Sequence, residues 1–306
     1  MVMDFYAQVS HNKKMTYVLF LMFFLLIGFL SFILSFILDL YMGVGFIFFF
    51  SIFGILSIIF AIGSYYNSDK IVLATTGATE VLKEKNPQLH NVIEELSIAS
   101  GLPKPRIFII KDPAINAFAT GRDPEHAVVC FTTGALERLN RNQIQGVAAH
   151  ELAHIKNYDV RTMTLATVLV GITVLMSDFL FRMFLYGSFR NSDSKNTGQI
   201  AIIAIVIAII LAILTPVIAK MITFAISRSR EFSADATAVE FTRNPEGLAS
   251  ALEVIASDNQ ILVSANNATA HLYISNPLAK KKSFMSSWFS THPPVQERIN
   301  KLRNIN

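Results

Sequence analysis

Long apolar stretches decide the setting in which this chain can fold. Tyr17 to Leu38 is a run of 22 residues without a charged side chain, and Gly43 to Tyr65 is a second such run. A helix rises about 1.5 Å per residue, so the first run spans about 33 Å, enough to cross a hydrocarbon core of about 30 Å. With 25 phenylalanines and 52% hydrophobic residues, the chain is too apolar for an ordinary soluble protein. We therefore expect an integral membrane protein.

Two more apolar stretches lie in the second half of the chain and predict a membrane hairpin. They run from Met163 to Phe184 and from Ile200 to Ile226. Asp178 and Arg182 lie four residues apart on one helical face of the first, where they can pair. Because charges inside a bilayer are costly, we favour a local ion pair near a helix end over a transport role.

Basic residues are distributed asymmetrically around these stretches. Lys13 and Lys14 precede the first and Lys70 follows the second, whereas the loop between them has no basic residue. Arg228 and Arg230 follow the fourth stretch. The positive-inside rule therefore places both termini and both polar regions in the cytoplasm, with the bilayer as a partner.

The remaining composition narrows the setting further. The first span is too long for a signal-peptide core and has no small-residue cleavage site after it, so we expect an uncleaved anchor. The single cysteine, Cys130, cannot form an internal disulfide and suits a reducing compartment. The net charge of +4 has only one dense basic run, residues 280–282, and no nucleic-acid motif accompanies it. We therefore expect no nucleic-acid partner.

A His-Glu-x-x-His run, from His150 to His154, is the strongest chemical signal. Asn140 and Gln143 form a capping-box pattern, which predicts that the run lies on a helix. Four residues apart on a helix, the two imidazoles leave one face and can share a tetrahedral zinc ion. Glu151 lies beside that face, free to act on a metal-bound water molecule. Two surface histidines on an ordinary helix are the alternative, but small and apolar neighbours are typical of a buried helix.

A catalytic zinc site typically has three protein ligands, so one more is needed. Glu231 is the best candidate, because it lies five residues beyond the fourth apolar stretch and would enter the same helix as Asp235. Asp235, one turn later, would accept the free N–H of a ligand histidine and fix its tautomer. The alternatives for the third ligand are His292, His271, Asp235 itself and Glu240.

The polar part before the histidine motif reads as mixed α/β. Asn86-Pro87 starts a helix, and Gly101 lies just past its end. Short strands are predicted at Arg106–Ile110, Ile115–Thr120 and Ala127–Thr132.

A sheet edge can hold a peptide substrate by pairing with its backbone, largely without regard to sequence. The run Asn116, Ala117, Phe118 and Ala119 is small and weakly polar, and we expect it to be that edge. A plain core strand is the alternative.

Several motifs then occur in a recognisable order. They are the two N-terminal spans, Asn116-Ala117-Phe118-Ala119-Thr120-Gly121, His150-Glu151-x-x-His154, the apolar hairpin, Ser229-Arg230-Glu231-Phe232-x-Ala234-Asp235-Ala236, and His292-Pro293-Pro294 with Glu297-Arg298. On these residues the chain resembles the HtpX family of bacterial membrane zinc metallopeptidases, and more distantly the CaaX prenyl endoprotease of eukaryotes.

The resemblance implies one zinc ion per chain, with His150, His154 and Glu231 as ligands and Glu151 as catalytic base. It also implies ATP-independent cleavage of damaged or misfolded membrane proteins on the cytoplasmic side of the bacterial inner membrane, in a stress response. The four apolar stretches, against seven spans in the CaaX enzyme, argue against a large intramembrane chamber and prenyl substrates.

The expected reaction is metal-assisted peptide hydrolysis. Zinc lowers the pKa of its bound water toward about 7, and Glu151 takes the proton and later delivers it to the leaving nitrogen. His292 is the candidate oxyanion donor, with a cap or packing role as its alternative and Tyr158 as the second candidate. The rival functions are a dedicated processing peptidase and a non-catalytic zinc-bound scaffold; the intact Glu151 argues against the scaffold.

The predicted fold is an α+β membrane protein with four apolar helices and a mixed α/β, zincin-like cytosolic domain. Residues 1–65 form the anchor, 66–161 the first catalytic part, 162–226 the hairpin, and 227–306 the second catalytic part with the C-terminal helices. The sequence does not predict the oligomeric state.

Overall fold

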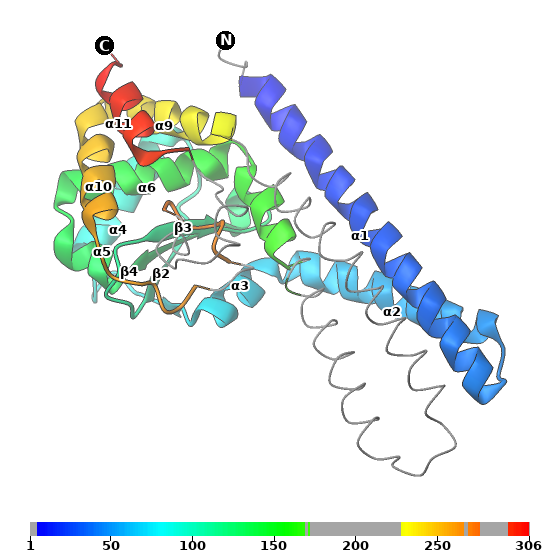
Figure 1. Cartoon of the computed structure of the whole chain (residues 1–306). Helices are drawn as coiled ribbons and strands as arrows, with labels where there is room; N and C mark the ends of the chain where they lie inside the picture. The colour runs from blue at the N-terminus through cyan, green and yellow to red at the C-terminus, as the bar shows by residue number, and fades with distance from the viewer. Residues whose placement is uncertain (1–4, 169–170, 172–227, 266–268, 276–292, 306) are drawn as a thin grey trace.

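A computed structural model describes residues 5–168, 171, 228–265, 269–275 and 293–305 (Figure 1). Most of the expected hairpin, with Asp178 and Arg182, lies outside these residues, as do His292 and the basic run at 280–282. The described chain has a globular part and an extension made of two long helices.

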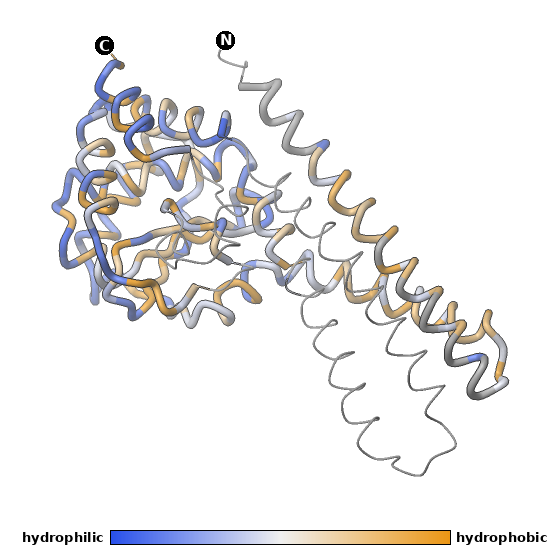
Figure 2. The backbone as a smooth tube through the Cα atoms, viewed as in Figure 1, coloured by the Kyte–Doolittle hydropathy of each residue, from blue (hydrophilic) through white to orange (hydrophobic). Residues whose placement is uncertain are grey.

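The extension consists of α1 (Phe5–Met42) and α2 (Phe46–Tyr66), which pack alongside each other. Much of their described length consists of hydrophobic residues, as the colouring of Figure 2 shows, and Ile47 of α2 is among those that are exposed. By length and composition, α2 is the one helix among the described residues that could cross a membrane. The corresponding apolar segment within α1 is shorter, Lys14–Phe29, so the expected four spans are not established.

A four-stranded sheet forms the centre of the globular part. Its order is β1-β2-β4-β3, with β2 and β4 parallel and the two outer strands antiparallel to their neighbours. The strands are β1 (Thr79–Glu80), β2 (Arg106–Ile110), β3 (Ala117–Thr120) and β4 (Val128–Thr132). The three predicted strands are thus confirmed, with β3 and β4 starting slightly later than expected, and β3 is an edge strand. The two-residue β1 was not predicted, because a pair of residues shows no periodicity.

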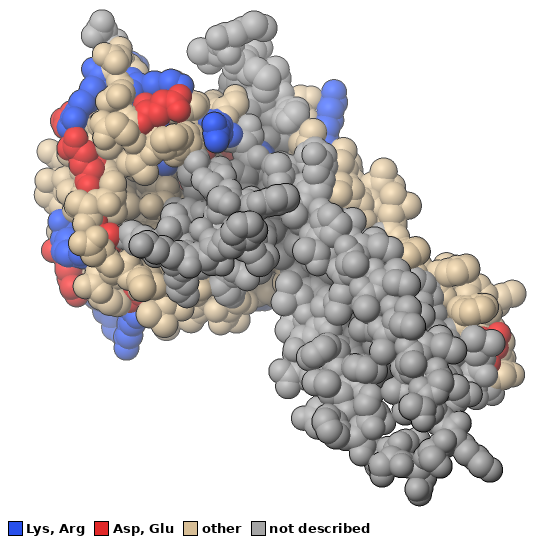
Figure 3. Space-filling view, viewed as in Figure 1, with Lys and Arg blue, Asp and Glu red and all other residues tan. Residues whose placement is uncertain are grey.

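The other described elements of the globular part are helices that precede, connect or follow the strands. The short elements are α3 (Ser68–Thr76), a 3₁₀ turn (Pro124–His126) and α5 (Thr133–Arg138). The longer ones are α4 (Pro87–Ser100), α6 (Arg141–Lys156), α9 (Arg228–Thr242), α10 (Pro245–Ser257) and α11 (Val295–Arg303). A further helix begins at residue 159 and is described to residue 168. Charged side chains gather mainly over this globular part (Figure 3).

Local signals set the ends of these helices as predicted. The Asn86 side chain accepts a hydrogen bond from the Leu89 amide, and Gly101 ends α4 in the left-handed region at φ 71°. The Asn140 and Gln143 capping box starts α6. The C-terminal helix α11 begins at Val295, with Pro294 as its N-cap residue.

Helix α6 runs through the middle of the helical layer and packs against α4, α9 and α10. Gly146 permits the approach of α10, because a Cβ there would lie 2.5 Å from the backbone nitrogen of Leu248. The apolar core between the sheet and these helices includes Val147, Leu152 and Leu248. The helix that carries the histidine motif is therefore held on several sides by side-chain packing.

A buried carboxylate fixes the start of β3. Asp258, just past α10, accepts a hydrogen bond of 2.7 Å from the Ile115 amide and forms two bonds of 3.0 Å with Arg138. Burial alone would raise the pKa of Asp258, but the bonds from Arg138 and from the amides of Ile115 and Gln260 lower that pKa to about 2. This contact joins the helical layer to the edge strand.

Asp258→Asn should therefore destabilise the protein by about 2 kcal/mol at pH 7, since hydrogen bonds to a charged group are lost. A carboxylate with a lowered pKa contributes stability above its unfolded pKa of about 4, and that contribution is lost as the pH falls toward about 2. Denaturant unfolding of the purified protein should show the difference between wild type and variant shrinking from pH 5 to pH 2. A difference that stays constant over this range would contradict the assignment.

Candidate metal centre

Helix α6 places two imidazoles together in the interior. His150 and His154 are 1% and 4% exposed, and their Nε2 atoms lie 3.1 Å apart. The rings can be buried because α6 carries small side chains, Ala148, Ala149 and Ala153, where it contacts its neighbours. The helical spacing of four residues turns both rings to one side, as the sequence predicted.

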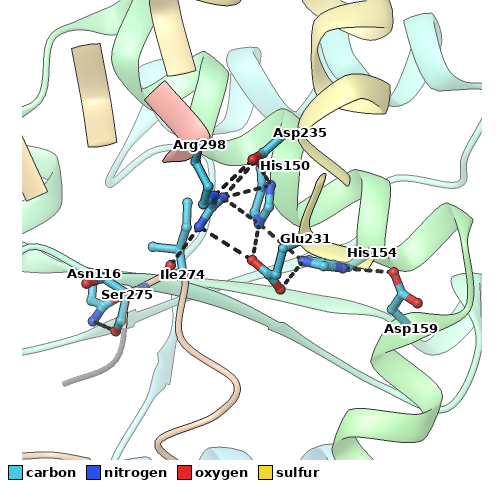
Figure 4. A network of polar contacts seen from close by, with 9 residues as sticks. All are labelled: Asn116, His150, His154, Asp159, Glu231, Asp235, Ile274, Ser275 and Arg298. Atoms are coloured by element: carbon cyan, nitrogen blue, oxygen red, sulfur yellow. Dashed lines mark hydrogen bonds and ion pairs between the residues drawn. The ribbon is translucent and has the colours of Figure 1, made fainter. Parts of the chain in front are cut away.

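Helix α9 brings a carboxylate to the same point, as Figure 4 shows. Glu231 Oε2 lies 3.7 Å from His150 Nε2, and its Oε1 lies 3.5 Å from His154 Nε2. The three groups offer ligand atoms within 4.8 Å of one another, and all three side chains are buried. Ligands at zinc distances of 2.0–2.2 Å around a tetrahedron are separated by about 3.4 Å. The residues present therefore fit a small divalent cation.

Carboxylates on the outer side of each ring fix its orientation. Asp235 Oδ1 lies 2.9 Å from His150 Nδ1, and Asp159 Oδ2 lies 2.9 Å from His154 Nδ1. Each ring thus uses Nδ1 for a carboxylate and turns Nε2 toward Glu231. A carboxylate behind a histidine is the usual arrangement around metal-ligating imidazoles.

A fully buried arginine links these groups to the C-terminal helix. Arg298, from α11, donates to Asp235 through Nε at 2.9 Å and through Nη2 at 2.7 Å. Its Nη1 lies 3.4 Å from Glu231 Oε2 and donates to the backbone oxygen of Ile274 at 3.2 Å. Bidentate pairing of this kind fixes both position and angle of the carboxylate.

Sequence reasoning missed the roles of Arg298 and Asp159. Arg298 belongs to the last of the sequence motifs. That motif indicated that the residue is important, but it did not indicate which groups Arg298 contacts. Asp159 lies five residues after His154, at the start of the next helix, and only the turn between the two helices brings it to the ring.

Glu151 lies beside the cluster, 1% exposed. It accepts a hydrogen bond from the backbone of Ala119 in β3, and its Oε1 has no hydrogen-bond partner among the described residues. Burial raises the pKa of Glu151 to about 7. The carboxyl group is therefore anchored to the sheet edge by one contact, and its other oxygen is a buried acceptor that a water molecule or a substrate could use.

The electrostatic environment differs between the two rings. Burial lowers the pKa of His150 to about 4, and the nearby Arg298 acts in the same direction. Burial also lowers the pKa of His154, but the hydrogen bond with Asp159 and the charge of Glu231 outweigh it and raise the pKa to about 9. Carboxylates that hold a proton this firmly also stabilise a metal cation in its place.

Other predicted site residues have different surroundings. His271 is buried, with Nε2 3.0 Å from the Thr167 hydroxyl and 3.2 Å from the Met163 carbonyl, and it is not part of the three-ligand cluster. Glu240 is exposed on α9, and Tyr158 has a positive φ of 60° in the turn after α6. His292 lies outside the described part of the chain.

Two histidines one turn apart on a buried helix, with a carboxylate from a second helix and a glutamate between the histidines, are the groups of a His-Glu-x-x-His metallopeptidase centre. Residues 83–306 match the family model described as Peptidase family M48. The chain belongs to this family.

Curated relatives match almost the whole chain. A protein described as "Protease HtpX homolog" from Dictyoglomus thermophilum is 43% identical over 304 residues, which cover 98% of this chain and 94% of the relative. An HtpX homolog from Streptococcus pyogenes serotype M28 is 38% identical over 302 residues, covering 98% and 99%. The chain is thus a metalloendopeptidase, and its family and curated relatives, together with the one candidate membrane helix α2, support a membrane metallopeptidase.

A solved structure, that of S. mikatae Ste24p, is also similar. The TM-score is 0.48 at 20% identity, and the match covers 90% of this chain and 62% of that chain.

Removing the Arg298 guanidinium should be strongly destabilising. Arg298→Met leaves Asp235 and Glu231 buried without their cationic partner, which typically costs about 3–5 kcal/mol. Thermal unfolding of the detergent-purified protein should show a large fall in Tm. Arg303→Met is the matched control on α11, because Arg303 pairs with Glu246 and Glu253 at the exposed surface. Equal shifts in the two variants would contradict the buried network.

Proposed function

We propose that this chain is a zinc-dependent endopeptidase in which His150, His154 and Glu231 hold the metal. The observation that carries the proposal is the convergence of these three buried groups from α6 and α9 at separations that suit tetrahedral zinc. Asp235 and Asp159 orient the two imidazoles, and Arg298 orients Asp235 and Glu231. One zinc ion per chain is the expected cofactor.

Glu151 is the proposed catalytic base. The chemistry that zinc supplies in such a site is Lewis acidity toward a water molecule and toward a peptide carbonyl. Glu151 Oε1 accepts a proton from the attacking water, and the same oxygen later gives the proton to the leaving nitrogen. The contact with Ala119 holds the carboxylate beside β3, so the proton is transferred next to a peptide bound at that edge.

The outer edge of β3 is the proposed substrate-binding strand. Just before β3, the Asn116 carbonyl accepts from the Thr132 amide and the Asn116 amide donates to the Thr132 hydroxyl, so the backbone groups of the next residue, Ala117, face the opposite side. The run Asn116, Ala117, Phe118 and Ala119 therefore offers every second residue to an added strand. Pairing of this kind recognises backbone rather than side chains, which suits unfolded or damaged membrane-protein substrates.

The biological role follows from the setting of the site. We propose that the enzyme acts in protein quality control at the bacterial inner membrane, with its centre on the cytoplasmic side. The basic residues that flank the apolar stretches support that orientation. An oxyanion role for His292 stays a prediction, and a dedicated processing peptidase is the alternative function.

Glu151→Gln tests the enzymatic proposal directly. The amide keeps the size of the side chain but cannot take a proton, so hydrolysis of an unfolded reporter polypeptide should fall by about 10²-fold or more. Bound zinc, measured by elemental analysis, should stay near one equivalent, because Glu151 is not a ligand. Hydrolysis at the wild-type rate by purified Glu151→Gln would contradict the mechanism.

A further inference from the structure

The edge of β3 is in contact with another part of the chain. The Ile274 amide donates a hydrogen bond of 3.0 Å to the Ala117 carbonyl, on the side of β3 away from β4. The Asn116 side chain donates to the Ser275 carbonyl at 3.0 Å and accepts from the Ser275 amide at 3.4 Å. The backbone of a substrate strand added to this edge would hydrogen-bond to these same groups.

A fourth contact ties this segment to the metal centre. Arg298 Nη1 donates to the Ile274 carbonyl, while the same guanidinium binds Asp235 and approaches Glu231 (Figure 4). The backbone of two consecutive residues, 274 and 275, is thus held by a strand carbonyl, a carboxamide and a guanidinium. These groups recognise a peptide backbone whatever its side chains.

Ile274 and Ser275 bind β3 at a position close to the proposed base, Glu151. Ala117 holds Ile274, and Ala119, two residues farther along, holds Glu151. Two residues of a strand span about 7 Å, so the segment lies within one peptide unit or two of the catalytic carboxylate. A substrate strand aligned for cleavage at Glu151 would have to use the part of the edge that Ile274 and Ser275 use.

The side chains of the segment add apolar contacts. Ile274 is 2% exposed and belongs to the main core with Ile299 and Leu302 of α11. Tyr273 is fully buried, and its ring packs edge-on against Phe118 at 5.1 Å between centroids. The Ile274 position therefore accepts an aliphatic side chain.

We propose that the segment Tyr273–Ser275, called here the strap, is a substrate-like occupant of the β3 edge, and that a peptide substrate binds by displacing it. The proposal rests on the proposed function. The strap competes from within the same chain, so its effective concentration at the edge does not depend on the protein concentration. An extended, unfolded polypeptide with an aliphatic residue at the Ile274 position fits this edge, because the backbone groups of such a chain are not already paired within a fold. The strap thereby raises the apparent KM for every substrate by a factor equal to the inverse of the fraction of time that the edge is free.

Weakening the strap should make the enzyme more effective at low substrate concentration. Ile274→Ala removes most of the buried side chain, so the KM for quenched, denatured casein should fall by about 10-fold or more without a matching loss of kcat. Val263→Ala is the control, because Val263 is 82% exposed in the same irregular stretch and should leave KM unchanged. A permanent structural role for Ile274 predicts instead an unchanged or higher KM with a lower kcat. That result would overturn the proposal.

Hydrogen exchange gives a second measurement, in a protein whose strap carries no substitution. In full-length, zinc-loaded Glu151→Gln, saturating denatured casein should remove protection from the Ile274 and Ser275 amides. If these amides keep their protection while casein binds, the strap proposal is wrong although the peptidase proposal stands. If wild type shows no Glu151-dependent hydrolysis, the peptidase proposal fails instead.

Discussion

Arg298 and Asp235 form a buried ion pair on which the geometry of the metal centre depends. The guanidinium binds Asp235 in two places, and Asp235 in turn holds the Nδ1 side of His150. Removing these charged groups from water carries a large desolvation free energy. That penalty is offset only because each charged group lies at hydrogen-bond distance from groups of opposite charge. Helices α6, α9 and α11 are therefore locked together at the point where their catalytic groups must meet. The burial that raises the pKa of Glu151 to about 7 belongs to the same closed interior.

The sheet edge and the metal centre are two parts of one arrangement. Asp258 fixes the start of β3 through the Ile115 amide, and β3 holds Glu151 through Ala119. Arg298 joins the centre to the backbone of Ile274, which lies along the same strand. A peptide on this edge would therefore meet the backbone-binding groups and the base in a fixed register.

Local patterns predicted much of this arrangement. Capping at Asn86 and Asn140 and the spacing of His150 and His154 depend on neighbours a few residues away, and the structure confirms these helix starts. Contacts between segments that lie far apart in the sequence could not be predicted from such local patterns. The pairing of Arg298 with Asp235 and of Ile274 with Ala117 joins residues whose separation in sequence carries no periodic signal. The proposed domain boundaries and the hairpin stay predictions, because the described residues do not include most of that region.

The central claim is that Glu231 completes a zinc site begun by His150 and His154. The most direct test is the zinc affinity of Glu231→Ala, measured by competition with a chelator, beside Glu240→Ala from the exposed side of the same helix. The account predicts that Glu231→Ala weakens zinc binding by more than the about 10- to 100-fold typical of outer partners. It also predicts wild-type affinity for Glu240→Ala. Unchanged zinc affinity in Glu231→Ala would contradict the account.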